Sequence, residues 1–100
     1  MSDMIRQVGE IDGLAERLHG NTKAADAFTF ASLREHVDEV QDLLQKGDPH
    51  WKAETVDILI HGYMLLARHG VTAEETGCLM PVRIGRFREK ITAAIQEGQG

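Results

Sequence analysis

The stretch AETVDILIHGYMLLARHG, residues 53–70, decides the fold class of this chain. Its apolar residues occupy nearly every direction around a helix instead of alternating, which predicts an α-helix that is buried on most sides. The polar side chains fall within a sector about 60° wide: Glu54, Asp57, His61 and Arg68. Buried carboxylates need a compensating charge, so this polar seam requires either basic side chains or a metal ion.

The remaining sequence carries helix start and stop signals and no strand pattern. We expect further helices over about residues 3–19, 32–46 and 82–96, with residues 21–31 ambiguous between a loop and one helical turn. Ser32 with Glu35 and Thr72 with Glu75 match the capping-box pattern, and Pro81 is expected to interrupt the segment that Thr72 opens. The central helix is expected to start at Asp48 and Pro49. Short connections favour antiparallel neighbours, which predicts an all-α antiparallel bundle of four to five helices.

Composition narrows the class of protein. A chain of 100 residues forms one domain, here residues 1–100, and its net charge of −5 argues against a long nucleic-acid face. The single Cys78 fits a reducing compartment and has no evident activating partner. There is no apolar signal core, and ILIHGYMLLA is too short to span a bilayer. We therefore expect a cytoplasmic protein without nucleic-acid or membrane partners.

The helix expected over residues 32–46 supplies more acidic groups. Its apolar stripe consists of Leu33, Val37, Val40 and Leu44. His36 and Glu39 lie on the shoulder of that stripe, so antiparallel packing would bring them to Glu54 and Asp57. Oxygen ligands that converge from two helices favour a hard cation, and Mg²⁺ leaves coordination positions free for phosphate oxygens.

These residues resemble a known family. LREHVDEVQDLLQKGD followed by AETVDILIHGYMLLARHG is similar to the all-α nucleoside triphosphate pyrophosphohydrolases of the MazG-like group, over about residues 33–75. Their pattern is E-E-x-x-E, a gap, and E-x-x-D. Here it corresponds to residues 35–39 (EHVDE), fourteen intervening residues, and residues 54–57 (ETVD). The family's second acid is His36 in this chain.

The resemblance implies hydrolysis of a nucleoside triphosphate between its α and β phosphates, as a house-cleaning activity. It implies that the ligands of Mg²⁺ are His36, Glu39, Glu54 and Asp57. Glu35 or Glu39 would take the proton of the attacking water. The imidazole at position 36 shifts the expected metal preference toward Mn²⁺ or a softer ion.

Substrate contacts are expected from cations and aromatic rings. Candidates for phosphate binding are His61, Arg83, Arg86 and Lys90, and candidates for stacking on the base are Phe28, Phe30 and Trp51. Many relatives carry a lysine and an asparagine before an R-R-[FY] ending. Leu79 and Arg83 occupy those places here, ahead of Arg86-Phe87, so this region departs from the family's pattern.

Structural interpretations compete for each of these residues. Glu54 and Asp57 suit the N-terminal turn of a helix, and Glu35 suits the capping box with Ser32. The two histidines could be satisfied by hydrogen bonds inside the bundle. The cations near the C-terminus could form a solvated face, and the aromatic candidates could belong to the core or to an interface.

Three other functions stay open: a catalytically silent bundle that serves as a binding or regulatory module, an enzyme like the phosphoribosyl-ATP pyrophosphohydrolases, and a bundle that binds iron or manganese through carboxylates with His36 and His61. Because a bundle of this size cannot cover an apolar central helix alone, we also expect a homo-oligomer, either a dimer or a dimer of dimers.

Overall fold

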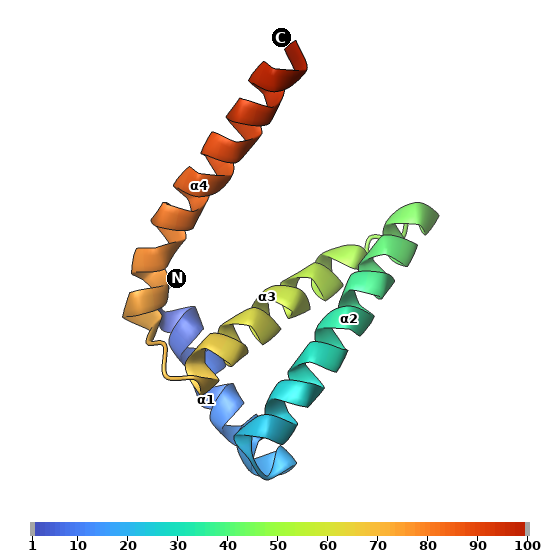
Figure 1. Cartoon of the computed structure of the whole chain (residues 1–100). Helices are drawn as coiled ribbons and strands as arrows, with labels where there is room; N and C mark the ends of the chain where they lie inside the picture. The colour runs from blue at the N-terminus through green and yellow to red at the C-terminus, as the bar shows by residue number, and fades with distance from the viewer. Residues whose placement is uncertain (1, 100) are drawn as a thin grey trace.

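The computed structural model describes residues 2–99 as four α-helices: α1 (Ser2–His19), α2 (Thr22–Lys46), α3 (Trp51–Arg68) and α4 (Ala73–Gln99). The prediction of an all-α protein is confirmed. α2 and α3 lie beside each other as an antiparallel pair, α1 packs across the end where α3 finishes, and α4 projects away from the other three (Figure 1). Within the described residues, no helix is long and apolar enough to cross a lipid bilayer.

The turn between α2 and α3 follows from its glycine. Gly47 adopts the left-handed conformation, with φ of 70°, which a residue without a Cβ reaches at little cost. The amide of Asp48 then donates to the carbonyl of Leu43, and the amide of Gly47 donates to that of Leu44. This pair of bonds is a Schellman motif. The predicted end of the helix at Gly47 is confirmed, whereas α3 begins at Trp51, later than Asp48 and Pro49 predicted.

Residues 22–31 of the ambiguous segment are helical, so α2 begins ten residues before the predicted start at Ser32. Asn21 is the N-cap, and its side chain accepts a hydrogen bond from the amide of Ala24. The interpretation of Ser32 and Glu35 as a capping box is wrong, because both lie inside α2. The cap predicted at Thr72 is confirmed, since the hydroxyl of Thr72 accepts a bond from the amide of Glu75, which is one of the two bonds of a capping box.

Pro81 does not end a helix, contrary to the prediction of two segments after residue 72; α4 runs through it from Ala73 to Gln99. A proline in a helix interior removes the bond to the carbonyl four residues earlier. That carbonyl belongs to Gly77, and both residues are exposed, so water can replace the lost donor. The proline is therefore tolerated on the solvent side of the helix.

The buried core is small and draws side chains from all four helices. Its apolar members are Ile5, Val8, Ala25, Met64 and Ala73. Helical spacing predicts one apolar stripe on α1 through Ile5, Val8, Ile11, Leu14 and Leu18, but only the first two are buried. Ile11, Leu14 and Leu18 are exposed, and the buried face of α1 continues from Ile5 and Val8 to Asp12 instead.

Arg68 is buried at the junction of α1, α2 and α3. Its side chain is 1% exposed, and its guanidinium binds Asp12 of α1 at 2.6 Å and Asp26 of α2 at 2.8 Å. It also donates to the hydroxyl of Thr29. Burial disfavours the charge on Arg68, but the hydrogen bonds to Asp12 and Asp26 outweigh it and raise the pKa of Arg68. His69 adds a second contact to Asp26.

We expect Arg68→Met to lower the free energy of unfolding by about 3–5 kcal/mol, because it leaves the carboxylate of Asp12 buried without its partner. Urea denaturation followed by circular dichroism measures this change. Lys46→Met is the matched control, since it removes an exposed ion pair with Asp42 and should leave the midpoint unchanged. Equal stability of the two variants would contradict the structural role of Arg68.

Stability should also depend on the ionisation of Asp26. The hydrogen bond from Arg68 lowers the pKa of Asp26 in the folded state. Its contribution is therefore present above the unfolded-state pKa of about 4 and is lost as the pH falls through the folded-state value. Urea midpoints between pH 6 and pH 3 should fall less steeply for Asp26→Asn than for the native chain. Asp38→Asn removes an exposed carboxylate of the same helix and controls for the change in net charge.

Candidate metal and phosphate site

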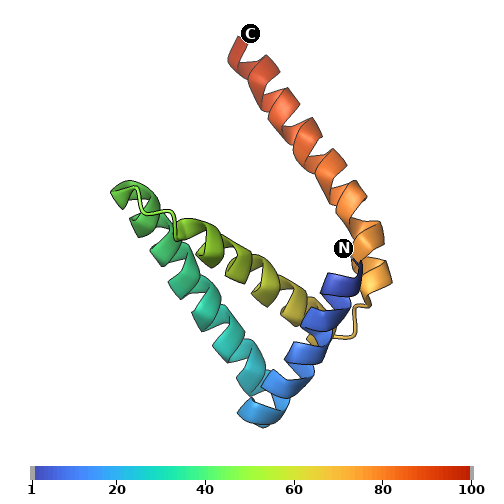
Figure 2. The same cartoon turned by 180° about the vertical axis from the view of Figure 1, so that it is seen from behind.

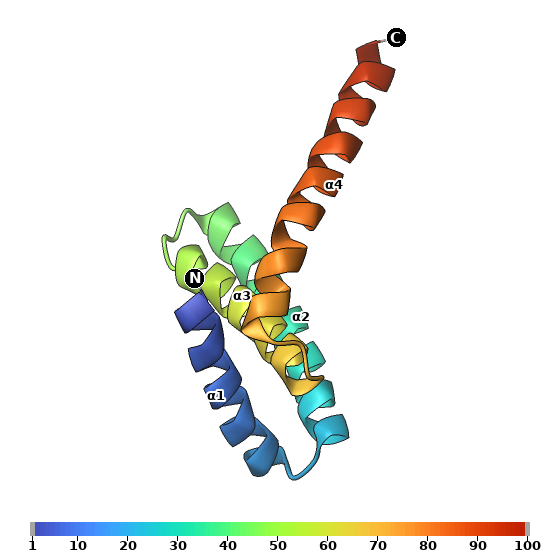
Figure 3. The ribbon, with the colours of Figure 1, turned by 90° about the vertical axis from the view of Figure 1, so that its left-hand side faces the viewer.

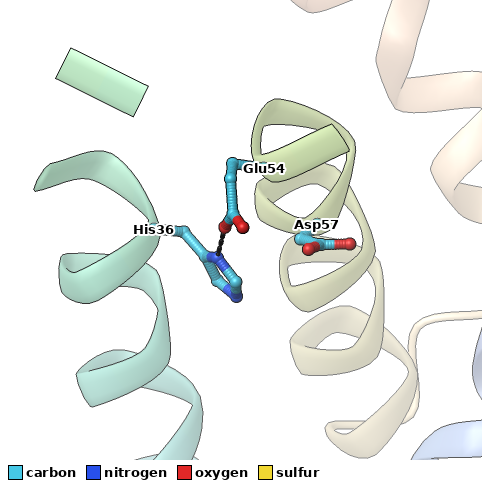
Figure 4. Close-up of side chains that lie close together, drawn as sticks. All are labelled: His36, Glu54 and Asp57. Carbon is cyan, nitrogen blue, oxygen red and sulfur yellow. Dashed lines mark hydrogen bonds and ion pairs between the residues drawn. The ribbon is translucent and has the colours of Figure 1, made fainter. Parts of the chain in front are cut away.

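His36 of α2 and Glu54 of α3 face each other across the antiparallel pair, and Asp57 lies one turn further along α3 (Figure 4). Nδ1 of His36 lies 2.5 Å from a carboxylate oxygen of Glu54. Each of these three side chains offers one ligand atom, and the three atoms lie within 4.8 Å of one another. His36, Glu54 and Asp57, called the α2–α3 cluster below, are half-buried.

The fold places His36 on the inner face of α2. Ala25 and Thr29 are the buried residues of α2, and His36 follows Thr29 by seven residues, which is two helical turns. Val37 and Leu44, which the sequence assigned to the apolar stripe, are 52% exposed instead. The imidazole therefore points toward α3 and does not lie on the shoulder of the contact.

Electrostatics divide the acids of this site into two kinds. A hydrogen bond from His36 lowers the pKa of Glu54, whose side chain is only 13% exposed. A hydrogen bond to Glu54, together with its negative charge, raises the pKa of Glu39. Glu54 is thus the stable carboxylate of the pair, and Glu39, one turn after His36 and more exposed, is the group that takes up a proton.

His61 borders the cluster from the next turn of α3. Its ring centroid lies 5.3 Å from that of His36. Burial lowers the pKa of His61, and the neighbouring His36 adds to this effect, so the ring favours its neutral form. Within residues 2–99, its buried Nδ1 has no hydrogen-bond partner. A neutral imidazole with an unpaired nitrogen is a group that can accept a hydrogen bond or coordinate a metal.

The donor set fits a divalent metal ion. Two carboxylates and one imidazole match the ligand preferences of Mn²⁺ and related ions, with Mg²⁺ also accepting the carboxylates. Ligands bound at about 2.1 Å lie no more than about 4.2 Å apart, so a small rotation of Asp57 or Glu54 would close the set. An ion would have to replace the hydrogen bond between His36 and Glu54.

Other candidates from the sequence lie at different distances from the cluster. Trp51 is one turn before Glu54 on α3, whereas Phe30 lies six residues before His36 on α2, about 9 Å along the helix. Phe28 lies further away and packs on the ring of His19. Glu35 is exposed on α2.

The cations of α4 do not approach the cluster within one chain. Arg83, Arg86 and Lys90 lie on the projecting part of α4, whereas the contacts of α4 with α1 are at its start (Figure 2). The guanidinium of Arg83 lies over the ring of Phe87, 5.9 Å from its centroid. Arg68, assigned to the same seam as Glu54, is fourteen residues away, about 21 Å along α3, and its charge is used by Asp12 and Asp26.

Sequence reasoning missed two contributors. His50 lies 3.5 Å from Glu54, four residues before it, and this spacing is a signal for a contact on a helix. Asp12 is buried at the Arg68 junction. Its spacing of four residues from Val8 and seven from Ile5 places it on their buried face, and this spacing could have indicated its burial.

Comparison with known proteins gave no similarity: no family model, no curated protein and no solved structure matches this chain.

We expect the α2–α3 cluster to bind Mn²⁺ in the absence of nucleotide, and Glu54→Gln to weaken this binding at least about tenfold. Isothermal titration calorimetry measures both affinities. His36→Glu should shift the preference toward Mg²⁺, because it replaces nitrogen by a hard oxygen ligand.

The matched control for metal binding is Asp42→Asn, which removes an exposed carboxylate of α2 outside the cluster. It should bind Mn²⁺ as the native chain does. An equal loss of affinity in Asp42→Asn and Glu54→Gln would show that binding is a property of the general negative charge.

Proposed function

We propose that this protein is a Mg²⁺- or Mn²⁺-dependent nucleotide pyrophosphohydrolase of the MazG-like kind, which cleaves a nucleoside triphosphate to a monophosphate and pyrophosphate. The observation that carries the proposal is the meeting of His36 with Glu54 and Asp57 across two antiparallel helices. Residues 35–39 (EHVDE) and 54–57 (ETVD), which carry the resemblance, supply these side chains. Clearing of non-standard or surplus nucleotides is the physiological role we infer from this resemblance.

The residues of the chain divide the chemistry. Glu54, Asp57 and His36 would hold the ion, which when bound neutralises phosphate charge and lowers the pKa of a water molecule. Glu39 is the better placed base, because Glu54 raises its pKa and it lies beside the cluster on an exposed edge. Glu35 is the second candidate for this proton transfer. His61 is available to donate a hydrogen bond from a ring N–H to a phosphate oxygen.

The substrate contacts of α4 need a second copy of the chain. Arg83, Arg86 and Lys90 lie on a helix that leaves the cluster, so the phosphates held by one protomer would meet these cations only from its partner. We propose a homo-oligomer, a dimer or a dimer of dimers, as the working form. Trp51, one turn from Glu54, is the aromatic residue best placed to stack on a base.

A second candidate function is a binding protein for manganese or iron. The closeness of the His36 and His61 rings favours it, since two imidazoles with two carboxylates are typical ligands of transition metals. Tight metal binding without any nucleotide turnover would identify this function.

The proposed reaction predicts pyrophosphate and a nucleoside monophosphate as products. A panel of ordinary and modified nucleoside triphosphates, with Mg²⁺ and with Mn²⁺, should reveal at least one substrate. Glu54→Gln/Asp57→Asn should reduce its turnover at least about a hundredfold, because phosphate charge is then left without its counter-ion. Chromatography of the nucleotide products, with separate assays for pyrophosphate and orthophosphate, measures the reaction.

Asp38→Asn/Asp42→Asn is the matched control, with the same loss of two negative charges from exposed positions on α2. It should retain the native rate. Release of orthophosphate would assign a different bond, and absence of turnover by the folded native protein across the panel would refute the enzymatic proposal.

A further inference from the structure

Within the described residues 2–99, the apolar face of α4 beyond Pro81 packs on no other helix. Beyond Pro81 the helix extends alone (Figures 1 and 3). Its large apolar side chains are all more than half exposed: Val82, Ile84, Phe87, Ile91 and Ile95. The last four recur at spacings of three and four residues, so they form one stripe along the helix. Such a face normally lies against another element.

The total surface measures how much is left uncovered. The chain exposes 7368 Å², whereas a compact monomer of 11.1 kDa exposes about 5,700 Å². The excess of about 1,700 Å² is twice what one partner buries in a standard interface. The radius of gyration is also larger than expected, at 16.4 Å compared with about 13 Å for a compact domain of this length. A partner of substantial size is required to cover this surface.

An apolar surface that could bind the stripe of α4 lies between α1 and α3. It is a groove of about 400 Å³ whose lining is almost entirely apolar. Its exposed members are Met4, Ile11, Val56 and Leu59, each between 51% and 63% exposed. The projecting part of α4 leaves this groove open in its own chain, since α4 is tied to α1 at its start by Arg6 and Glu74 and then diverges.

Charge distinguishes the possible partners for α4. Residues 82–100 carry four basic and two acidic side chains, and residues 1–81 carry seven basic and fourteen acidic ones. Two copies of α4 would therefore bring like charges together, whereas α4 on the body of another copy would bring opposite charges together. The second arrangement is the favourable one.

We propose that α4 of one copy lies with its apolar stripe in the α1–α3 groove of a second copy, and that the exchange is reciprocal. A two-fold axis makes both contacts equivalent and covers both exposed surfaces at once. This assignment specifies the homo-oligomer of the proposed function, and its test needs neither nucleotide nor metal, so it can fail or succeed independently of catalysis.

Light scattering coupled to size-exclusion chromatography tests the arrangement. The native chain should have the mass of a dimer or of a multiple of it, and Phe87→Glu/Ile91→Glu should have the mass of a monomer. Both positions are exposed in the single chain, so helix content measured by circular dichroism should persist. Leu14→Glu/Leu18→Glu, a pair on α1 that is at least as exposed and lies outside the groove, should keep the native mass. A monomeric native chain, or a Phe87→Glu/Ile91→Glu variant of native mass, would overturn the proposal.

Photo-cross-linking tests whether α4 contacts the α1–α3 groove or another surface of the second copy. It changes only one residue of the apolar stripe of α4. Benzoylphenylalanine at position 95 should give a product of dimer size whose linked peptide belongs to α1 or α3. A product linking α4 to α4, or no product of dimer size, would overturn the assignment of the groove.

Discussion

The pairing of Arg68 with Asp12 and Asp26 is the constraint on which this arrangement of helices depends. The core contains few fully buried apolar side chains, so hydrophobic burial alone defines the positions of α1, α2 and α3 poorly. The guanidinium has a planar set of donors, and it contacts one carboxylate from each neighbouring helix. Shifting either neighbour by one helical turn would leave a charge without its partner. This ionic junction therefore sets the register of α2 against α3, and with it the meeting of His36 and Glu54.

Helix type and most helix ends were predictable because their causes are local. Gly47 and Gly70 stop helices through backbone conformation, and Thr72 caps the next one through its own hydroxyl. The start of α2 was missed because both Asn21 and Ser32 are suitable N-cap residues. Only the tertiary packing of Ala25 and Thr29 decides between these two possible starts. The independence of α4 from the bundle was also hidden, since an apolar stripe has the same pattern whether it faces its own core or another chain.

Part of the candidate site followed from helical spacing, and part depended on three-dimensional packing. Glu54 and Asp57 share a face of one helix, which the sequence alone establishes. Which residue of α2 faces them depends on the rotation of that helix, and the rotation follows from Thr29 and Asp26 at the Arg68 junction. The stripe drawn through Val37 and Leu44 was therefore rotated from the true inner face, and His36 was placed on a shoulder instead of at the contact. A pattern of charges cannot reveal this rotation, because it arises from contacts with a third helix.

The contact between His36 and Glu54 makes this site different from one that consists only of carboxylates. Carboxylates that face one another between helices repel, and they need a cation for the helices to pack. Here an imidazole on α2 donates a hydrogen bond to the carboxylate on α3, so the α2–α3 pair is held together by the chain itself. An ion bound at the proposed site would have to compete with that bond, so its affinity would be lower, but the packing of the two helices would not depend on it. In the proposed site, His36 would thus lower the affinity for an ion while stabilising the α2–α3 pair. A nucleotide that carries its own phosphate-bound ion would add its binding energy to that of the cluster alone.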